Sequence, residues 1–428
     1  MKDTCYPAKY STRDVKINTP VRADEACRIM NTFSGQPGLY LHVPFCESIC
    51  PFCPYNKMLY DQALAGTYFA ALEKEIGWYL QCSARPFTSL YIGGGTPTLC
   101  LDELARILAR LDIAGERAIE VLPNHASEKN IARMQAMGIN FLSLGIQSFD
   151  ASVLAYLGRP NTVFDNRKAL EACLGRFDCV DVDLIFDVSY ENDSVFFRDL
   201  ETCFDAGVDQ VSSYPLMRFG YTPFGKSRHS PGKEHRVLAE AESLARKFGY
   251  ERRSVWTFNR RNSPRYTSIT REFYLGCGAG AGSFTGQLFV LNHFSVCAYV
   301  EKVDRNCLPV ARATQLSTSL AAAYYLFWQA YTGTIDTVRF DTLYPGRRLL
   351  TALLEVFIKA GLLQRLDGSL KLTQRGYDRY HDLERWVTYH FIEPLWADMM
   401  QEHEFLRAHL KPMGVRQRFW LRLAGLHQ

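Results

Sequence analysis

From about residue 39 to residue 214, the spacing of the apolar residues changes repeatedly between that of a strand and that of a helix. Short apolar runs, typical of buried parallel strands, are each followed by a segment whose apolar residues recur at helical spacing. The predicted strands are 39–43, 88–92, 118–122, 141–145, 180–186 and 209–214, and the predicted helices are 62–81, 101–111, 127–137, 150–157, 165–175 and 193–206. This repetition predicts an α/β fold, a partial (β/α)6 barrel whose active face lies at the carboxyl ends of the strands.

The pattern changes on both sides of this region. The first residues show no clear periodicity, whereas helices 318–331 and 346–360 and a hairpin at Asp367-Gly368 predict a small winged-helix module. An aromatic-rich terminal helix or helix pair is expected over 386–410. The expected parts are an N-terminal extension over 1–37, a barrel with its ligand-binding loops over 38–310, and a C-terminal winged-helix domain with a helical tail over 311–428.

The charge, the hydropathy and the cysteine usage of the chain exclude several classes of protein. The net charge of +4, from 49 basic and 45 acidic residues, is too balanced to indicate a nucleic-acid partner. No apolar signal region begins the chain, and the longest apolar-rich stretch, 316–331, is interrupted by polar residues, so no membrane span is expected. Thirteen cysteines without a secretory signal argue against a disulfide framework, and most are expected to be small buried hydrophobes. This usage predicts a reducing, cytoplasmic location.

Three cysteines lie close together after the first predicted strand. Cys46, Cys50 and Cys53 have the spacing C-x3-C-x2-C. Thiolates are the ligands of iron–sulfur clusters, which normally take four, so three on one loop leave one iron open to a substrate. A zinc site or a reactive dithiol is the alternative. Zinc requires a fourth ligand nearby, and His42 could serve, although it lies within a strand pattern.

Polar residues and glycines gather at the ends of the predicted strands. The run Gly93–Thr98 follows a strand, and its backbone can approach a ligand closely. Glu120, Gln147, Arg159 and Asp183 lie at or just beyond the ends of successive strands. Taken singly, each could be a satisfied structural group, because burying it without partners is costly. Four at equivalent positions favour a shared ligand.

These motifs resemble one known family. With Phe52 before its last cysteine, the cysteine loop is similar to the signature of the radical S-adenosylmethionine (SAM) superfamily. From about residue 38 to 380 the chain resembles the HemN-like branch, which includes oxygen-independent coproporphyrinogen III oxidase, the haem chaperone HemW, and class C methyltransferases and cyclopropanases. The resemblance is carried by Tyr40–Cys46, Gly93–Thr98, Leu142–Phe149, Asp183–Ile185, Tyr214–Leu216, Gly276–Ser283 and the winged-helix tail.

The resemblance implies a cofactor set and its ligands. A [4Fe–4S] cluster is implied on Cys46, Cys50 and Cys53, with two SAM molecules. Motif position places Tyr40, Gly94 and Glu120 at the cluster-bound SAM. The positions that match contacts to the second SAM are Phe52, Gly95, Thr96, Gln147, Arg159 and Asp183, and those that match further SAM-contact loops are Gly220 and Gly282.

Two departures from the porphyrinogen oxidase matter. That enzyme carries a fourth cysteine two residues after the third, where this chain has Tyr55 after Cys53. Its Gly-Leu-Pro-x-Gln-Thr segment is replaced here by Phe186–Asn192. Both departures argue against decarboxylation of coproporphyrinogen.

The resemblance therefore implies a radical SAM enzyme. An electron from a reductant such as flavodoxin or ferredoxin cleaves SAM on the cluster to a 5′-deoxyadenosyl radical. We expect the second SAM to supply a carbon to an sp2 carbon of a conjugated small molecule, by methylation or cyclopropanation. An aromatic content of 13% is compatible with such a flat substrate. The alternatives are a HemW-like haem chaperone and a coproporphyrinogen III oxidase-like oxidoreductase of tetrapyrrole metabolism.

Overall fold

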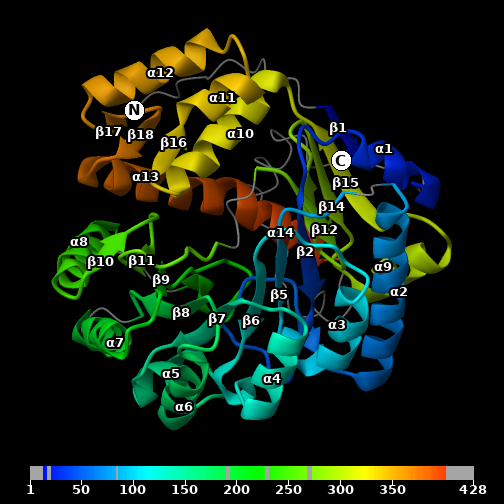
Figure 1. Ribbon diagram of the computed structural model, residues 1–428, viewed down its shortest axis with the longest axis horizontal. Helices are drawn as coiled ribbons and strands as arrows, with labels where there is room; N and C mark the ends of the chain where they lie inside the picture. Colours follow the sequence, from blue (N-terminus) through cyan, green and yellow to red (C-terminus); the bar gives the residue numbers. More distant parts are fainter. Residues whose placement is uncertain are drawn as a thin grey trace.

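Six parallel strands form the centre of the fold (Figure 1). The computed structural model describes residues 13–16, 21–82, 85–188, 193–226, 231–267 and 272–401. The central strands, in spatial order, are β2 (Gly38–Val43), β5 (Leu90–Gly94), β6 (Arg117–Val121), β7 (Phe141–Gln147), β8 (Cys179–Phe186) and β9 (Gln210–Pro215). Each pairs in parallel with the next, so their carboxyl ends meet at one edge and the predicted α/β architecture is confirmed.

Helices connect these strands and cover the outer side of the sheet (Figure 1). They are α2 (Gln62–Leu80), α3 (Leu101–Leu108), α4 (Glu128–Ala136), α5 (Ala151–Leu157), α6 (Val163–Cys173) and α7 (Asp193–Ala206). Ser127 is the N-cap of α4, since its hydroxyl accepts from the amide of Asn130 at 3.3 Å. Local signals therefore set where these helices begin.

The sheet extends beyond the predicted strands on both sides. In the described part of the chain it has 13 strands, in the order β1-β15-β14-β13-β12-β2-β5-β6-β7-β8-β9-β11-β10. The added strands are β1 (Arg13–Lys16), β10 (Tyr250–Arg252), β11 (Thr257–Arg260), β12 (Tyr274–Cys277), β13 (Gly282–Phe284), β14 (Leu288–Asn292) and β15 (Val310–Gln315). The glycine-rich segment Gly276–Ser283 is a tight connection between β12 and β13, in which Gly278 and Gly280 have φ of +106° and +78°.

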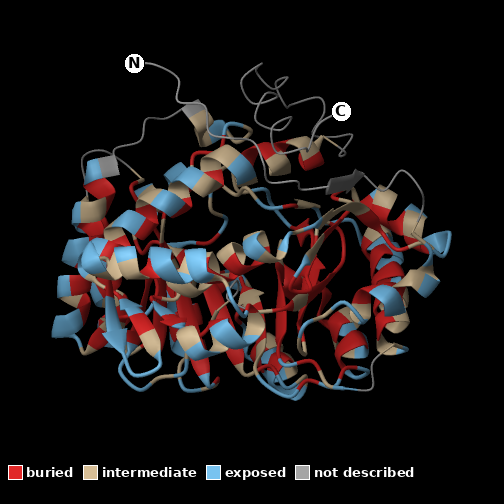
Figure 2. Ribbon diagram, turned by 90° about the horizontal axis from the view of Figure 1, so that it is seen from above, coloured by how far each residue is buried: buried red, intermediate tan, exposed pale blue. Residues whose placement is uncertain are grey.

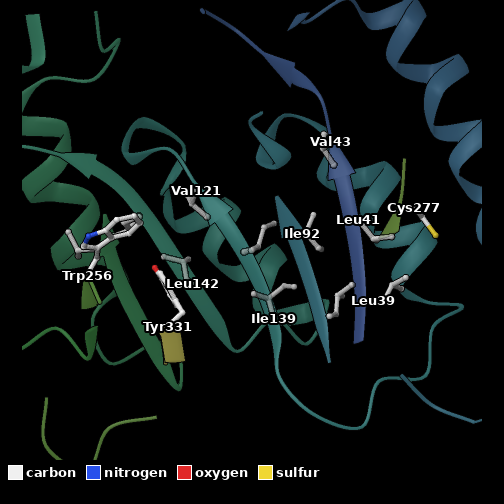
Figure 3. Packing of buried hydrophobic residues seen from close by; sticks show 14 of the residues in the cluster. Leu39, Leu41, Val43, Ile92, Val121, Ile139, Leu142, Trp256, Cys277 and Tyr331 are labelled. Carbon is white, nitrogen blue, oxygen red and sulfur yellow. The ribbon is translucent and has the colours of Figure 1, made fainter. Parts of the chain in front are cut away.

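The two faces of the central strands differ in character. Leu39, Leu41 and Val43 of β2 are fully buried and point to one side, where they pack with Ile92 under the helices (Figure 3). Residues at alternate positions face the other way, where Tyr40 packs against a smaller, tyrosine-containing cluster. Buried residues are concentrated in the sheet and on the helix sides that face it (Figure 2). The inner face is therefore the one that offers hydroxyl and carboxyl groups.

The C-terminal region forms a second, smaller sheet with helices. Its elements are α10 (Thr318–Tyr331), β16 (Thr334–Asp336), α11 (Thr337–Leu343), α12 (Arg348–Lys359), β17 (Leu363–Leu366), β18 (Ser369–Leu372), α13 (Gln374–Val387), a π-helical turn (Thr388–Ile392) and α14 (Glu393–Met400). The predicted hairpin is confirmed, with Gly368 at φ +64° between β17 and β18. Helix α11 was not predicted. The predicted helix over 386–410 extends past the described residues, and the three-part division of the chain stays a prediction.

A buried hydrogen-bond chain attaches α13 to the barrel side of the fold. Trp256 Nε1 donates to Nδ1 of His381 at 3.0 Å, and His381 Nε2 lies 2.7 Å from the carboxylate of Glu234 on α8 (Pro231–Lys247). Arg385 donates to the same carboxylate at 2.7 Å. Because Nδ1 accepts the hydrogen bond from Trp256, it carries no proton, and His381 is the neutral Nε2–H tautomer. Burial lowers the pKa of His381 and so favours this neutral form.

Of the nine described cysteines outside the loop, five are buried as expected and four are not. The buried free cysteines are Cys100, Cys173, Cys179, Cys203 and Cys277, while Cys297 is exposed and Cys307 half-buried. Cys27 and Cys82 instead form a disulfide, with Cα atoms 4.9 Å apart, that joins α1 (Ala26–Met30) to the end of α2. Folding brings together two residues 55 positions apart, which their local patterns do not indicate.

No helix among the described residues is both long and apolar enough to span a bilayer. The compartment in which the protein works stays a prediction.

Glu75 on α2 is a fully buried carboxyl that holds the glycine turn after β12. It accepts hydrogen bonds from the amide of Gly278 at 2.9 Å, the side chain of Asn292 at 2.9 Å and the hydroxyl of Tyr299 at 2.6 Å. Burial raises its pKa to about 7, against the lowering effect of these three donors. The carboxyl thus links a helix to two segments far away in the sequence.

We expect Glu75→Ala to lower the free energy of unfolding by about 3–5 kcal/mol, because three buried donors lose their acceptor. Urea denaturation followed by circular dichroism measures this. Glu75→Gln keeps one acceptor and should lose less. Because the folded carboxyl holds a proton that the unfolded chain releases between about pH 4.5 and 7, its contribution to stability declines as pH rises through that interval. The Gln variant should lack this pH dependence, and an unchanged stability in the Ala variant would contradict the assignment.

Candidate active site

The three-cysteine loop lies at the carboxyl end of β2 and is closed at its base. The short strands β3 (Phe45–Cys46) and β4 (Met58–Leu59) pair in parallel on its two sides. Within the loop the amide of Cys53 donates to the carbonyl of Cys50 at 3.2 Å. Cys46 is buried, and Cys50 and Cys53 are half-buried. The loop therefore presents three thiols from a short, pinned segment.

The glycine run after β5 packs directly on this loop. The amides of Gly95 and Thr96 donate to the carbonyls of Val43 and Phe45, both at 2.7 Å. A Cβ on Gly95 would lie 2.5 Å from the Phe45 carbonyl oxygen and 2.9 Å from the sulfur of Cys46. Glycine is thus required at 95 for the backbone to approach the thiol, which gives the run a structural role besides any ligand contact.

His42 is engaged on both ring nitrogens. Nε2 lies 2.9 Å from the carbonyl oxygen of Asn56, and Nδ1 lies 2.7 Å from the hydroxyl of Tyr40. Because a carbonyl only accepts, Nε2 carries the proton and Nδ1 accepts from Tyr40. Burial lowers the pKa of His42 to about 4. His42 therefore holds the end of the cysteine loop, and its ring has no lone pair left for a zinc ion.

The cysteine loop fits an iron–sulfur cluster. Among the described residues, no three Cys, His, Asp or Glu side chains converge on a single-ion site. The three thiolates of a cubane bind three different irons and do not converge on one point. Burial raises the pKa of Cys46 to about 12, against the lowering effect of the Thr96 hydroxyl, so iron binding has to displace this proton. Tyr55 stands where the porphyrinogen oxidase has its fourth cysteine, and a tyrosine provides no thiolate for an iron.

A first group of polar atoms lies where β5 and β6 end. Glu120 accepts from the hydroxyl of Tyr91 and, at 3.2 Å, from the amide of Gly94. Burial raises the pKa of Glu120 to about 7, with the Tyr91 hydroxyl opposing it and Asp183 adding to it. The ring of Tyr40 packs on Tyr91 with centroids 5.8 Å apart. Three predicted residues, Tyr40, Gly94 and Glu120, are thus brought together.

Tyr91 was missed by the sequence reasoning. It is paired with Tyr40 in the parallel ladder between β2 and β5. The sequence carried one signal for it: Tyr91 lies between Leu90 and Ile92, so its side chain points to the opposite face of the strand from these two apolar residues.

A second group lies along β7 and β8 and reaches the cysteine loop; Asp183 lies within β8 rather than at its end. Arg159 directs Nη1 to the sulfur of Cys50 at 3.5 Å and Nη2 to the carbonyl of Gly145. Its Nε is buried without a partner among the described residues. Asp183 accepts from the hydroxyl of Ser143 at 2.7 Å; burial raises its pKa to about 6, while Ser143 and Arg159 lower it.

Gln147 joins this second group from an unusual backbone position. Its φ is +70°, a conformation that is uncommon for a residue other than glycine and that is often found at functional sites. A Cβ on Gly145 would lie 3.2 Å from the Gln147 amide nitrogen and 3.4 Å from Nη2 of Arg159. Gln147 and Arg159 therefore meet above a glycine that leaves room for both.

The other predicted residues occupy less central places. Thr96 is buried beside Cys46, and Phe52 packs with Leu157, Ile185 and Leu216 beside the loop. Gly220 donates its amide to the Glu393 carboxylate of α14. Gly282 is the first residue of β13 and pairs with β14, which places it in the sheet extension.

Helix α14 lies within the aromatic-rich terminal segment that the sequence predicts, and its contact with the cysteine loop was not predicted. Trp396 lies 5.6 Å, ring to ring, from Tyr55 of the cysteine loop and stacks on Phe219 at 6.2 Å. The hydroxyl of Tyr221 donates to the carbonyl of Pro54 at 3.0 Å. In Figure 1 this helix crosses in front of the central strands. The C-terminal helices thus contact the loop that holds the thiols.

Comparison with known proteins agrees with this geometry. Residues 40–200 match the radical SAM superfamily. The chain is 25% identical over 362 residues to the heme chaperone HemW of Bacillus subtilis (strain 168), covering 79% of this chain and 95% of that protein. It is 26% identical over 317 residues to the oxygen-independent coproporphyrinogen III oxidase of Pseudomonas aeruginosa, covering 65% of this chain and 68% of that one.

Among solved structures, the coproporphyrinogen III oxidase HemN from Escherichia coli has the same fold. It superposes with a TM-score of 0.74 at 21% identity, covering 90% of this chain and 97% of that one. The superfamily implies a [4Fe–4S] cluster and SAM as cofactors. The thiol loop, the parallel sheet that presents it and these relatives together show that the chain is a radical SAM enzyme that belongs to the HemN-like branch of the superfamily.

Proposed function

We propose that the protein binds two SAM molecules and transfers a SAM-derived carbon to an sp2 carbon of a conjugated small molecule. The observation that carries this proposal is the pair of polar groups beside one cysteine loop. Glu120 with Gly94 forms the first, and Arg159, in contact with the sulfur of Cys50, belongs to the second. Two ligands held by these groups would lie next to each other, as a transfer between them requires.

The residues have the following roles in this proposal. Cys46, Cys50 and Cys53 hold the cluster, which with SAM and an electron from a flavodoxin or ferredoxin supplies the 5′-deoxyadenosyl radical. Tyr40, Gly94 and Glu120 orient the first SAM. The second SAM is contacted by Phe52, Gly95, Thr96, Gln147, Arg159 and Asp183, with Gly220 in a further contact loop; Gly282, in strand β13, is left without a role. The Trp396 contact with Tyr55 holds α14 against the cysteine loop.

Isotope transfer tests the proposal directly. The reconstituted, reduced protein is incubated without oxygen with candidate acceptors and with SAM that carries a 13C-labelled methyl group. Mass spectrometry follows 5′-deoxyadenosine, S-adenosylhomocysteine, methylthioadenosine and the acceptor. Label in the acceptor supports carbon transfer, whereas hydrogen abstraction from the acceptor without label indicates a one-SAM enzyme.

Coproporphyrinogen oxidation is the second candidate, because relatives carry that name. The loop argues against it, since Tyr55 stands where the oxidase has its fourth cysteine. We expect no conversion of coproporphyrinogen III to protoporphyrinogen IX, with SAM and reductant in excess, by chromatography of the porphyrins. The Pseudomonas aeruginosa oxidase run in parallel is the positive control. Decarboxylated product over multiple turnovers would overturn the expectation.

A haem chaperone role is the remaining candidate, favoured by the 95% coverage of Bacillus subtilis HemW. Haem titration separates it from an enzyme. A Soret change that saturates at one haem per chain, without SAM consumption, would favour the chaperone. His42 is an unsuitable axial ligand, because both of its ring nitrogens are already bonded.

A further inference from the structure

Two polar side chains, Tyr91 and Glu120, meet over a glycine on the inner face of the barrel. Ile92 of β5 pairs with Ile119 of β6, so Gly93 and Glu120 are the next residues on neighbouring strands. A Cβ on Gly93 would lie 2.7 Å from Cε1 of Tyr91 and 2.8 Å from Oε1 of Glu120. Glycine at 93 therefore provides the space in which the Tyr91 hydroxyl reaches the carboxyl group.

The ring of Tyr91 is held by two other tyrosines. Its centroid lies 5.8 Å from that of Tyr40 and 5.7 Å from that of Tyr266. Tyr91 and Tyr266 are both buried, in the same cluster on the inner face. Contacts between aromatic rings have preferred geometries, so they fix the ring plane and with it the position of the hydroxyl. Tyr91 is thus a rigid donor beside the carboxyl group of Glu120.

Glu120 keeps hydrogen-bonding capacity after its contacts with the chain. The Tyr91 hydroxyl donates to Oε1, and the amide of Gly94 donates to Oε2 at 3.2 Å. An ionised carboxylate has about four acceptor sites, so about two of them stay free. Because Glu120 is only half-buried, a ligand on the inner face can reach them.

We propose that Tyr91 is a positioning residue, whose hydroxyl fixes the Glu120 carboxylate over Gly93 so that its free acceptor sites bind hydrogen-bond donors of the first SAM. SAM carries such donors in its ammonium group and its ribose hydroxyls. The inference rests on the proposed role of Glu120 at the first SAM. It adds Tyr91 and Gly93 as the residues that hold the carboxylate in its binding position.

The charge of Glu120 gives this role a measurable signature. Burial raises the pKa of Glu120 to about 7, while the Tyr91 hydroxyl lowers it, Asp183 of β8 raises it and the amide of Gly94 lowers it. The other titratable groups that interact with Glu120 are Tyr40 of β2, Tyr266, and Cys53 and Tyr55 of the cysteine loop. Protonation removes the negative charge of Glu120, so SAM affinity should fall as the pH drops through about 7. Without the Tyr91 hydroxyl the pKa rises, and the fall in affinity should begin at a higher pH.

A binding measurement tests the inference. The reduced, reconstituted protein is mixed with increasing amounts of SAM at several pH values between about 6 and 9 and frozen within seconds. The change in the EPR signal of the cluster reports occupancy by the first SAM. We expect Tyr91→Phe to weaken binding about tenfold or more at pH 7, the effect of one hydrogen bond to a charged group. The midpoint of the pH dependence should move upward by about one pH unit.

Gly93→Ala tests the space under the pair. Gly93 is not among the glycines with positive φ, so its backbone accepts alanine, and the added Cβ has to displace Tyr91 or Glu120. This variant should also weaken SAM binding. Gly66→Ala is the matched control, because nothing lies within 4 Å of a Cβ added there on α2. It should bind SAM as the wild type does.

Tyr250→Phe is the matched control for the tyrosine. It removes a buried hydroxyl that donates to the carbonyl of Val208 from β10, an edge strand of the large sheet. The affinity and the pH midpoint should both stay unchanged. Thermal melting confirms that each variant is folded.

Three outcomes would overturn the inference. The first is a folded Tyr91→Phe variant with the affinity and midpoint of the wild type. The second is an equal loss of affinity at every pH, which indicates a structural role alone. The third is a Glu120→Gln variant that keeps the affinity or the pH dependence of the wild type, since Tyr91 acts through that carboxylate. Absence of carbon transfer in the isotope experiment, by contrast, refutes the two-SAM reaction and leaves these affinities as measured.

Discussion

Replacement of Cys46, Cys50 or Cys53 by Ala is expected to abolish both cluster binding and SAM cleavage. Each thiol supplies one of only three ligands in the loop, and the next position of the motif is Tyr55. The wild type should hold roughly four irons per chain after anaerobic reconstitution. Iron analysis, the charge-transfer absorbance and 5′-deoxyadenosine formation measure the loss, which should exceed about a thousandfold in rate because the cluster supplies the electron that cleaves SAM.

Two other cysteines are the controls for this prediction. Cys100 is buried in the 3-10 turn before α3, and Cys307 is half-buried after α9 (Val296–Asp304). Cys100→Ala and Cys307→Ser should keep the iron content and the activity. A variant that lacks all three loop cysteines and still retains iron and absorbance would disprove the assignment of the cluster.

Arg159→Ala and Asp183→Ala are expected to separate SAM cleavage from carbon transfer. Loss of a charged contact in a ligand site weakens binding by roughly 1.5–3 kcal/mol, or about ten- to a hundredfold. Both variants should keep the cluster and form 5′-deoxyadenosine slowly, while transfer of a SAM-derived carbon falls much further. Quantitative mass spectrometry of 5′-deoxyadenosine against labelled product measures the split.

Asp178, the residue just before the same strand, offers a matched control. It accepts from the side chain of Asn140 at 2.9 Å, and it is exposed. Asp178→Asn should leave both activities unchanged. If the Arg159 and Asp183 variants lose solubility and both activities together, these residues only brace the barrel. A folded variant with undiminished carbon transfer would refute the two-SAM reaction.

The contact of Arg159 with Cys50 adds a requirement to this experiment. Removal of the guanidinium also removes a donor from the cysteine loop, so iron content has to be measured for the Arg159 variant. Asp183 touches Ser143 rather than a cysteine, and its variant is the cleaner of the two.

The sequence by itself was sufficient for the central fold. Alternating periods located β2 and β5–β9 with their helices, because each of these elements is buried on a regular face that its own residues encode. The start of α4 at Ser127 and the hairpin at Asp367-Gly368 followed from local capping and turn chemistry. The cysteine motif needed nothing beyond its spacing, since its three thiols are neighbours along the chain.

Only the tertiary structure decided how distant residues meet. Three contacts join residues whose neighbouring sequence gives no sign of the partner. They are the hydrogen bond between His42 and Asn56, the contact of Arg159 with Cys50, and the Cys27–Cys82 disulfide. In the sequence Glu384 is one more polar position of an amphipathic helix, and only packing leaves its Oε2 buried without a hydrogen-bond donor among the described residues. Local periodicity encodes which face of an element is buried, whereas the identity of the partner across that face depends on the whole chain.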